Sequence, residues 1–306
     1  MGPTATGKTD LALALAERLP LGLISVDSAM VYRHLDIGTG KPAPGTLVRH
    51  PHRLIDIRDP WEQYSAGDFV TDASRAVREI SAAGRIPLLV GGTLLYFRSL
   101  TEGLSALPAA DPDLRSELDA RAAREGWPAL HAELATLDPV AASRIGVMDR
   151  QRIQRALEVR RLTGQPISAQ QHRAPAAGRG KFLKVALVPR DRQLLVTQIT
   201  RRLKDMLECG FVGEVESLLA LPRVNPGCPA LRAVGYRQIA ELVQGRCGLA
   251  EAENRALAAT RQLAKRQLTW LRREDCDLWL DMESDNLLAD LEKAVLAAVP
   301  RMQYPS

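Results

Sequence analysis

The sequence has few cysteines and no long apolar run. Its four cysteines lie far apart and form no C-x-x-C pair, at Cys209, Cys228, Cys247 and Cys276. This spacing argues against a disulfide framework or a zinc site and favours scattered reduced thiols. No apolar stretch approaches the roughly 20 residues that span a bilayer, and no charged-then-apolar leader begins the chain. These absences predict a soluble, cytoplasmic protein with no membrane partner.

The bulk composition is that of an ordinary globular protein. Hydrophobic residues make up 46% and charged residues 25% of the 306 positions, so the chain can bury one large core or two modest ones. The net charge of +5 and the pI near 9.2 lean basic. Net charge alone indicates nucleic acid only weakly, and the positions of the basic residues decide more.

The chain opens with GPTATGKT, Gly2 to Thr9, which has the G-x-x-x-x-G-K-T spacing of a phosphate-binding loop. Its glycines let successive N–H groups face phosphate oxygens, and the next helix adds its positive N-terminal end. Lys8 would reach the terminal phosphates, and the Thr9 hydroxyl would hold Mg²⁺. Such a loop normally follows a buried strand, yet only Met1 precedes it. We therefore expect further apolar residues to belong before the loop.

Apolar strands and amphipathic helices alternate along much of the chain. Continuous apolar strands of this kind predict a parallel sheet covered by helices on both faces, an α/β fold. The segments expected to be strands are 21–26, 53–57, 86–90 and 182–188, with another near Trp279. The clearest helices are 8–19, 65–83, 250–274 and one that starts at Asn286. Residues 104–181 are helical and charged, and they predict an insertion domain in a core of residues 1–103 and 182–306. Its linker-like end is Ala174–Lys181.

Polar residues follow two of the predicted strands. Asp27 and Ser28 end the strand 21–26, and Gly91-Gly92-Thr93 ends the strand 86–90. Ligands bind beyond the carboxyl ends of such strands, so Asp27 could act as a general base and Thr93 as a positioning donor. Both could equally be turn formers. Phosphoryl-transfer enzymes usually place a carboxylate after a second apolar strand, and its absence after 86–90 argues against ATPase chemistry.

Arginine and lysine concentrate in three segments, DRQRIQRALEVRRLT (149–163), RAVGYRQ (232–238) and ATRQLAKRQLTWLRR (259–273). Each alone could be a solvated surface. Three such segments in one chain with a phosphate loop favour a polyanionic partner, and arginine with interleaved aromatics suits RNA.

The motifs also resemble a known family from end to end. GPTATGKT, ISVDSAMVYRHLDIGTGKP, HRLIDI, YSAGDF, GRIPLLVGGTLLYFRSL, QRIQRALEV, VGYRQ and TRQLAKRQLTWLR occur in this order. The sequence is similar to the tRNA dimethylallyltransferases, also called tRNA isopentenyltransferases. Thr6 and Gly40 are small departures that exchange one small residue for another.

The resemblance implies that dimethylallyl diphosphate and Mg²⁺ bind at the loop. The prenyl group would move to N6 of the adenosine immediately 3′ of the anticodon in a tRNA, and diphosphate would leave. Lys8, Asp27 and Thr93 are the expected catalytic residues. The implied diphosphate contacts are Gly2, Pro3, Thr4, Ala5, Thr6, Gly7, Lys8, Thr9 and Arg202. The implied contacts with the anticodon stem-loop are Asp27, Ser28, Ala29, Met30, Thr93, Arg115, Gln151, Arg152, Ile153, Gln154, Arg155, Arg232, Gly235, Tyr236, Arg237, Lys265, Arg266, Trp270 and Arg272.

Two alternatives stay open from the residues. A P-loop kinase for a small molecule or nucleoside would explain the loop but not the arginine segments. A non-catalytic RNA-binding protein with a relict loop would keep its tRNA affinity without Lys8. We expect the protein to be a monomer.

Overall fold

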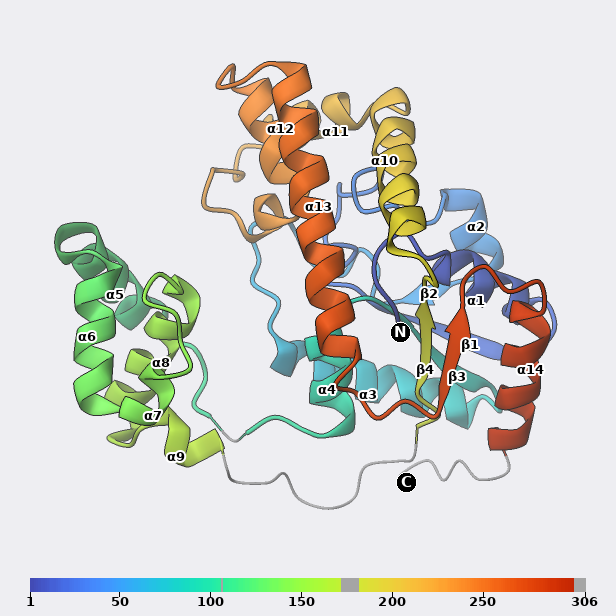
Figure 1. The fold of residues 1–306 in the computed structure, drawn as a ribbon, viewed down its shortest axis with the longest axis horizontal. Coiled ribbons are helices and arrows are strands. Elements are labelled where there is room, and N and C mark those ends of the chain that lie inside the picture. The colour runs from blue at the N-terminus through green and yellow to red at the C-terminus, as the bar shows by residue number, and fades with distance from the viewer. Residues whose placement is uncertain (106, 172–181, 300–306) are drawn as a thin grey trace. The chain divides into compact units, whose positions relative to one another are not determined.

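The computed structural model describes residues 1–105, 107–171 and 182–299, which form two compact units (Figure 1). The first unit is Met1–Thr101 with Arg179–Ser306, and the second is Glu102–Gly178. The predicted linker 174–181 lies outside the described residues. The predicted domain boundaries at 103/104 and 181/182 stay a prediction.

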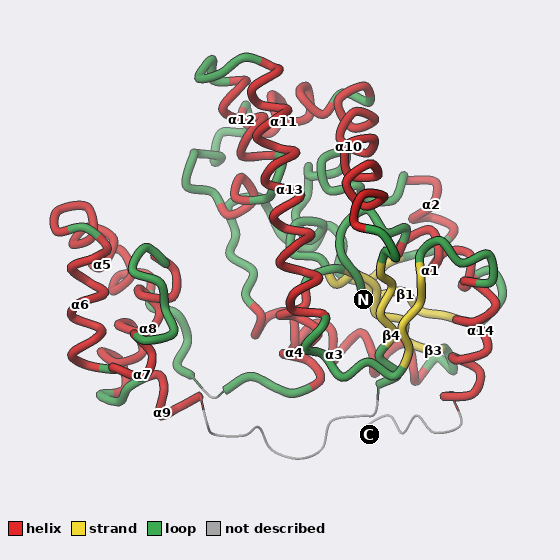
Figure 2. Tube along the Cα trace, viewed as in Figure 1, coloured by secondary structure: helices red, strands yellow, loops and turns green. Residues whose placement is uncertain are grey.

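Two small parallel sheets form the centre of the first unit (Figure 2). One has the order β2-β1-β3, and the other pairs β4 with β5. The strands are β1 (Leu21–Val26), β2 (His52–Arg53), β3 (Ile86–Gly91), β4 (Val185–Val188) and β5 (Leu278–Asp281). All six residues of β1 are buried, as expected for a central parallel strand.

Helices pack on both faces of the sheet because alternate β1 side chains point to opposite sides. Ile24 and Val26 join a core with helices α3 and α4, and Leu21 and Leu23 join another with α1 and α14. The helices of this unit are α1 (Lys8–Ala16), α2 (Pro44–Arg49), α3 (Ala66–Ala82), α4 (Leu94–Thr101), α10 (Arg192–Glu208), α11 (Phe211–Leu219), a 3₁₀ helix (Pro229–Arg232), α12 (Tyr236–Val243), α13 (Leu249–Leu271) and α14 (Leu287–Ala298). The predicted α/β class with a helix-covered parallel sheet is confirmed.

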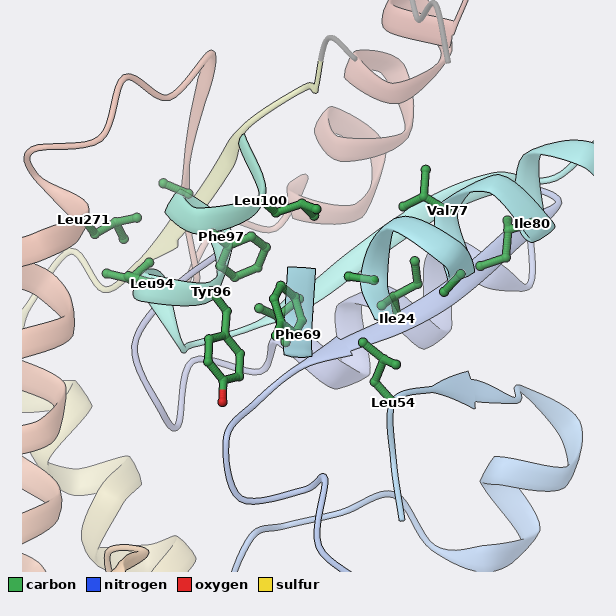
Figure 3. Packing of buried hydrophobic residues seen from close by; sticks show 14 residues of the cluster. Ile24, Leu54, Phe69, Val77, Ile80, Leu94, Tyr96, Phe97, Leu100 and Leu271 are labelled. Atoms are coloured by element: carbon green, nitrogen blue, oxygen red, sulfur yellow. The ribbon is translucent and has the colours of Figure 1, made fainter. Parts of the chain in front are cut away.

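The core on the α3 side is shown in Figure 3. The Phe69 and Tyr96 rings stack with centroids 4.5 Å apart, and both are at most 5% exposed. Helix α3 begins where predicted, since Ser65 and Asp68 form a reciprocal capping box that satisfies two end N–H groups. This packing anchors β1 and α4. Asp27 follows β1 directly, and Thr93 directly precedes α4.

The predicted strand 53–57 is wrong beyond its first residue. Strand β2 ends at Arg53, and Leu54 and Asp56 have φ angles of 67° and 56°. Left-handed residues cannot continue a strand, so the chain turns here. The Asp56 N–H donates instead to the Met30 carbonyl over 3.2 Å, which ties this turn to the segment after β1.

The regular secondary structure of the second unit is entirely helical in its described residues. It contains α5 (Pro112–Glu125), α6 (Trp127–Leu137), α7 (Pro139–Ala142), α8 (Arg150–Thr163) and α9 (Ile167–Gln171). Its own core centres on Leu118, Leu130, Leu134 and Leu157, each 0% exposed. In neither unit is any described helix long and apolar enough to cross a membrane.

Candidate functional site

The phosphate loop, Gly2–Thr9, is folded tightly against the start of α1. Ala5 and Gly7 have φ angles of 62° and 73°, which turn the backbone back on itself. The buried Thr6 hydroxyl donates to the Pro3 carbonyl over 3.0 Å. A Cβ on Gly2 would lie 2.3 Å from the Leu187 carbonyl oxygen of β4, so only glycine fits there. The N–H groups that begin α1 are thereby arranged for an anion.

Met1 enters this loop alongside β4. Its amino group donates to the Val185 carbonyl over 2.7 Å, and the Leu187 N–H donates to its carbonyl over 2.8 Å. Met1 thus pairs with β4 as a strand residue would. The predicted strand ahead of the loop stays a prediction.

Lys8 is a half-buried cation that contacts only neutral oxygens. Its Nζ donates to the Pro3 carbonyl and lies 3.5 Å from the Thr6 hydroxyl. Burial, and secondarily the charge of Arg202, lower the pKa of Lys8 to about 7, while Asp27 opposes the shift. Among the described residues Lys8 makes no ion pair, so an incoming phosphate would supply its missing counter-charge.

Arg202 of α10 is a second cation without an ion pair in the described part of the chain. Its Nη2 donates to the Thr39 carbonyl over 2.8 Å. A Cβ on Gly40, which has φ 65°, would lie 2.2 Å from that nitrogen, so the chain passes directly over the guanidinium. Burial lowers the pKa of Arg202, and the charges of Asp27 and Asp10 oppose that shift. Arg202 therefore belongs to the electrostatic environment of the loop.

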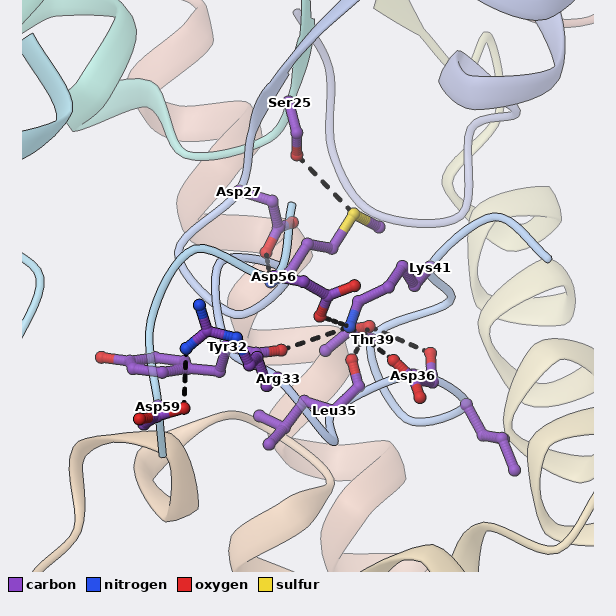
Figure 4. A network of polar contacts seen from close by, with 12 residues as sticks. Ser25, Asp27, Tyr32, Arg33, Leu35, Asp36, Thr39, Lys41, Asp56 and Asp59 are labelled. Atoms are coloured by element: carbon purple, nitrogen blue, oxygen red, sulfur yellow. Dashed lines mark hydrogen bonds and ion pairs between the residues drawn. The ribbon is translucent and has the colours of Figure 1, made fainter. Parts of the chain in front are cut away.

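The segment 36–41 that covers Arg202 is held by an acid and a lysine. The Glu214 carboxylate accepts the N–H groups of Asp36, Ile37 and Gly38 at 2.6–3.1 Å. At the other end Lys41, whose side chain is 3% exposed, extends its Nζ between carboxylates (Figure 4).

That Nζ lies 2.6 Å from Asp56 Oδ1 and 3.2 Å from the Tyr32 carbonyl, and it also pairs with Asp36. Such charge-assisted bonds fix the segment on both sides. Nothing in the motif pattern singled out Glu214 or Lys41.

Asp27 and Thr93 lie together at the carboxyl ends of β1 and β3, as the sequence predicts. Asp27 Oδ1 accepts the N–H groups of Ala29 and Met30 at 2.8 and 3.2 Å. Thr93 Oγ1 accepts the Ser28 N–H at 3.2 Å. Oδ2 of Asp27 has no hydrogen-bond partner among the described residues. One oxygen thus holds the turn, and the other makes no hydrogen bond within the described part of the chain.

Gln267 of α13 lies within the basic segment 259–273, but its contacts with the phosphate loop and the end of β3 were not predicted from the sequence. Its Oε1 accepts the Thr4 N–H at 2.9 Å, and its Nε2 donates to the Gly92 carbonyl at 2.8 Å. A signal was available, because buried Ala264 and Leu271 lie three and four residues away on the same helix face. The arginines of this helix drew attention to the opposite face.

The predicted RNA contacts in the first unit divide by burial. Arg232, Arg237, Lys265, Arg266 and Arg272 are all exposed. Gly235 and Tyr236 are buried, and the Tyr236 hydroxyl donates to Glu214 Oε1 at 2.5 Å. Trp270 packs partly against the α3-side core. The exposed basic side chains are open to solvent, whereas Tyr236 helps to hold the segment 36–41 through Glu214.

The predicted RNA contacts in the second unit divide in the same way. Gln151 and Arg152 are exposed at the start of α8, while Ile153 is 0% exposed in the core. Arg115 donates from Nε and Nη2 to Glu158 at 2.7 and 3.0 Å, and Arg155 pairs with the same carboxylate. Gln154 donates to the Arg115 carbonyl and to Asp119. The structure therefore gives Arg115 and Arg155 internal partners.

Fold and site together define a P-loop α/β protein with a helical insertion. Its phosphate loop faces a carboxylate at the end of β1, and β3 ends in glycines and a threonine. That arrangement suits a reaction in which the loop binds a phosphate group while the carboxylate accepts a proton.

Comparison with known proteins agrees with this class. Residues 30–274 match the family described as IPP transferase, and residues 1–58 match isopentenyl transferase. The chain is 55% identical over 273 residues to the tRNA dimethylallyltransferase of Thioalkalivibrio sulfidiphilus (strain HL-EbGR7), covering 89% of this chain and 85% of that protein. It is 50% identical to the tRNA dimethylallyltransferase of Bordetella pertussis (strain Tohama I), covering 98% and 96%.

A solved structure, the full-length tRNA isopentenylpyrophosphate transferase from Bacillus halodurans, has the same fold. The TM-score is 0.70 at 35% identity, covering 98% of this chain and 95% of that one. The chain belongs to the IPP transferase family. The resemblance predicted from the motifs is confirmed, and these matches support the transferase and not the kinase alternative.

Proposed function

We propose that this protein transfers a dimethylallyl group from dimethylallyl diphosphate to N6 of the adenosine 3′-adjacent to the anticodon of a tRNA. The relatives named above are tRNA dimethylallyltransferases. The observation that carries the proposal is that the phosphate-loop lysine and the carboxylate after β1 lie at the same edge of the sheet. Among the described residues Lys8 is a half-buried cation without an ion pair, and Asp27 has one carboxylate oxygen without a hydrogen-bond partner.

The loop and its two cations would bind the leaving group. The N6 nitrogen attacks C1 of the allyl chain, the C1–O bond breaks, and its electron pair goes to diphosphate. The loop N–H groups, Lys8 and Arg202 would stabilise this growing negative charge in a buried site where donors are already fixed. The diphosphate is held and released, and no phosphoryl group is transferred.

Asp27 would accept the N6 proton. An exocyclic adenine amine is a poor nucleophile until its proton is taken, and a placed carboxylate supplies such assistance. Oδ1 stays occupied by the turn that Ala29 and Met30 close, which would aim Oδ2 at the base. Thr93 supports this turn from β3 through the Ser28 N–H. The adenine must leave its stack to reach this partly buried carboxylate at the end of β1, as in other base-modifying enzymes.

Mg²⁺ is the proposed cofactor, and the residues present fit it. The Thr9 hydroxyl, in the first turn of α1, makes no hydrogen bond among the described residues. No group of three or more His, Cys, Asp or Glu side chains in this part of the chain could hold a metal alone. That suits Mg²⁺, which usually keeps waters and binds through substrate phosphates with few protein ligands. When bound, it would neutralise diphosphate charge.

The exposed basic residues of each unit would contact the tRNA backbone. Arg266 and Arg272 on α13 and Arg152 on α8 are exposed, and phosphate contacts of this kind position a nucleic acid. Because the proposed substrate is tRNA, we propose that the protein acts in the cytoplasm.

A transfer assay tests the proposal. Labelled dimethylallyl diphosphate, Mg²⁺ and an anticodon stem-loop with adenosine 3′ of the anticodon are incubated with the protein without ATP. We expect label in the RNA and release of diphosphate. Asp27→Asn keeps an oxygen for the Ala29 and Met30 N–H groups but cannot serve as the base, so transfer should fall about 10²–10⁴-fold.

The RNA affinity of Asp27→Asn should stay within about twofold of the unchanged protein. Absence of label from folded protein would refute prenyl transfer. Full turnover by Asp27→Asn with weak RNA binding would show that Asp27 only contacts RNA.

A further inference from the structure

Gln267 connects two parts of the site that are far apart in the sequence. The Thr4 N–H belongs to the phosphate loop, and the Gly92 carbonyl belongs to the end of β3. One side-chain amide binds both, at 2.9 and 2.8 Å. The two bonds use the acceptor and the donor end of the amide, so the network also fixes which way the amide points.

The residues around the Gln267 amide leave space for it and fix its position. A Cβ on Gly92 would lie 2.4 Å from Gln267 Nε2 and 3.2 Å from the Gly2 carbonyl oxygen. Glycine therefore leaves the space in which the amide reaches β3. Gln267 is only partly buried, but its position is set by Ala264 and Leu271, which are at most 2% exposed on the same helix.

One hydrogen bond of Gln267 is to the loop proposed to bind diphosphate, and the other is to the strand end beside the proposed proton acceptor. The Thr4 N–H points to Gln267, which fixes the bend of the loop whose remaining donors would meet diphosphate. The Gly92 carbonyl precedes Thr93, whose hydroxyl accepts the Ser28 N–H next to Asp27. The bridge thus sets the spacing between the leaving-group site and the proton acceptor.

We propose that Gln267 is a positioning residue that holds the phosphate loop in register with the end of β3. This rests on the proposed function, and Gln267 acts through Thr4 and Gly92 without touching the reacting atoms. A displacement of about 1 Å between reacting groups can lower a rate about 10²-fold. Loss of the bridge should therefore lower kcat more than it weakens the binding of either substrate.

The test compares Gln267→Met with Gln262→Met. Methionine has nearly the volume of glutamine but neither hydrogen-bonding group, and Gln262 is exposed on the same helix. We expect Gln267→Met to lower kcat about 10- to 100-fold, with KM for both substrates within threefold and an unchanged melting temperature. Gln262→Met should match the unchanged protein. A kcat within twofold for both variants would overturn the proposal.

A second variant approaches the bridge from β3. Gly92→Ala places a methyl group against Gln267 Nε2, so it should break the same bond. If the two residues act as one bridge, the double variant should be no worse than about the poorer single variant. Losses that multiply would show two independent effects and would overturn the proposal.

Amide hydrogen exchange separates this proposal from the proposed function. Exchange at residues 4–9 and 92–93 should quicken in Gln267→Met and not in Gln262→Met, whether or not prenyl transfer occurs. If the unchanged protein shows no transfer but this difference appears, the proposed function fails and the bridge stands. Unchanged amide exchange in Gln267→Met would refute the positioning role of Gln267, even if prenyl transfer by the unchanged protein is normal.

Discussion

The phosphate loop and the centre of the insertion use buried charge in opposite ways. In the insertion, the Glu158 side chain is 0% exposed, yet Arg115, Arg155 and the Asp111 N–H all donate to it. In the first unit, Lys8 and Arg202 are half-buried cations whose contacts among the described residues are with neutral oxygens. The insertion pairs its buried charge within the chain, whereas the phosphate loop has cations without an ion pair among the described residues.

The pKa shifts follow this difference. Burial acts to raise the pKa of Glu158, but hydrogen bonds from Arg115, Arg155 and Asp111 more than offset it and lower the value. Burial lowers the pKa of Lys8, and the charge of Asp27 opposes that shift only in part. Unsatisfied charge in a buried position is costly and persists where a ligand completes it. The comparison therefore distinguishes Arg115 and Arg155, which have a structural partner, from Lys8 and Arg202, which we propose bind the substrate diphosphate.

The largest expected effect is on stability, in the insertion. Glu158→Ala removes the common partner of two arginines and leaves both charges unpaired. We expect about 3–5 kcal/mol of local stability to be lost, seen as faster amide exchange in α5 and α8 of the full chain.

The control for this change is Glu117→Ala. Glu117 is 57% exposed and pairs with Arg161, so its loss should cost about 0–1 kcal/mol. Equal effects of the two changes would mean that burial does not distinguish these ion pairs.

The next effect is on catalysis. Lys8→Met should lower kcat about 10²–10³-fold, the usual loss when one preorganised donor to a developing anion is removed. Its melting temperature should stay the same or rise, because an unpaired buried charge is removed. The matched control is Lys204→Met, an exposed lysine of α10, which should change neither quantity. A strongly destabilised Lys8→Met with normal turnover would give Lys8 a structural role.

A smaller effect is on pH dependence. Free Lys8 has a pKa lowered to about 7, and bound diphosphate would raise that pKa, so binding above about pH 7 must take up a proton. The dissociation constant for dimethylallyl diphosphate should rise up to about tenfold from pH 8 to pH 9, and Lys8 should add little dependence below about pH 6.

Lys8→Arg isolates this dependence, because arginine stays charged throughout. Calorimetric titrations at both pH values should show little change for that variant. The same tenfold change in both proteins would assign the titration to another group.

Local patterns in the sequence predicted the loop, Asp27 and Thr93. Lys8 and Asp27 each lie in a short motif, and parallel strands bring their carboxyl ends to one edge. Gln267 was missed because its partner Thr4 is 263 residues away, and only packing of α13 brings the two together. The turn after β2 was also missed, since Leu54 adopts a left-handed φ angle that leucine rarely takes, although the left-handed Asp56 is a residue type common in turns.

Burial likewise could not be predicted for single members of a motif. In QRIQR, Arg152 is exposed, whereas Arg155 turns inward to Glu158. Three residues apart on a helix they share a broad face, but only the position of Glu158 decides which one is paired. The motif predicted a basic helix, and tertiary contacts divide its arginines between structure and surface.

The smallest expected effect tests that division on RNA binding. Arg152 makes only a 3.6 Å contact with Asp149, and Arg161 on the same helix has a 2.6 Å ion pair with Glu117. If Arg152 and Arg266 each neutralise one phosphate, their alanine variants should flatten the plot of log affinity against log salt by about 0.7–0.9 each. Arg161→Ala should leave the slope unchanged, because its charge is already paired within the protein. Fluorescence anisotropy of a labelled anticodon stem-loop at several salt concentrations measures this, and equal slopes for all three variants would show that pairing does not determine which arginines meet RNA.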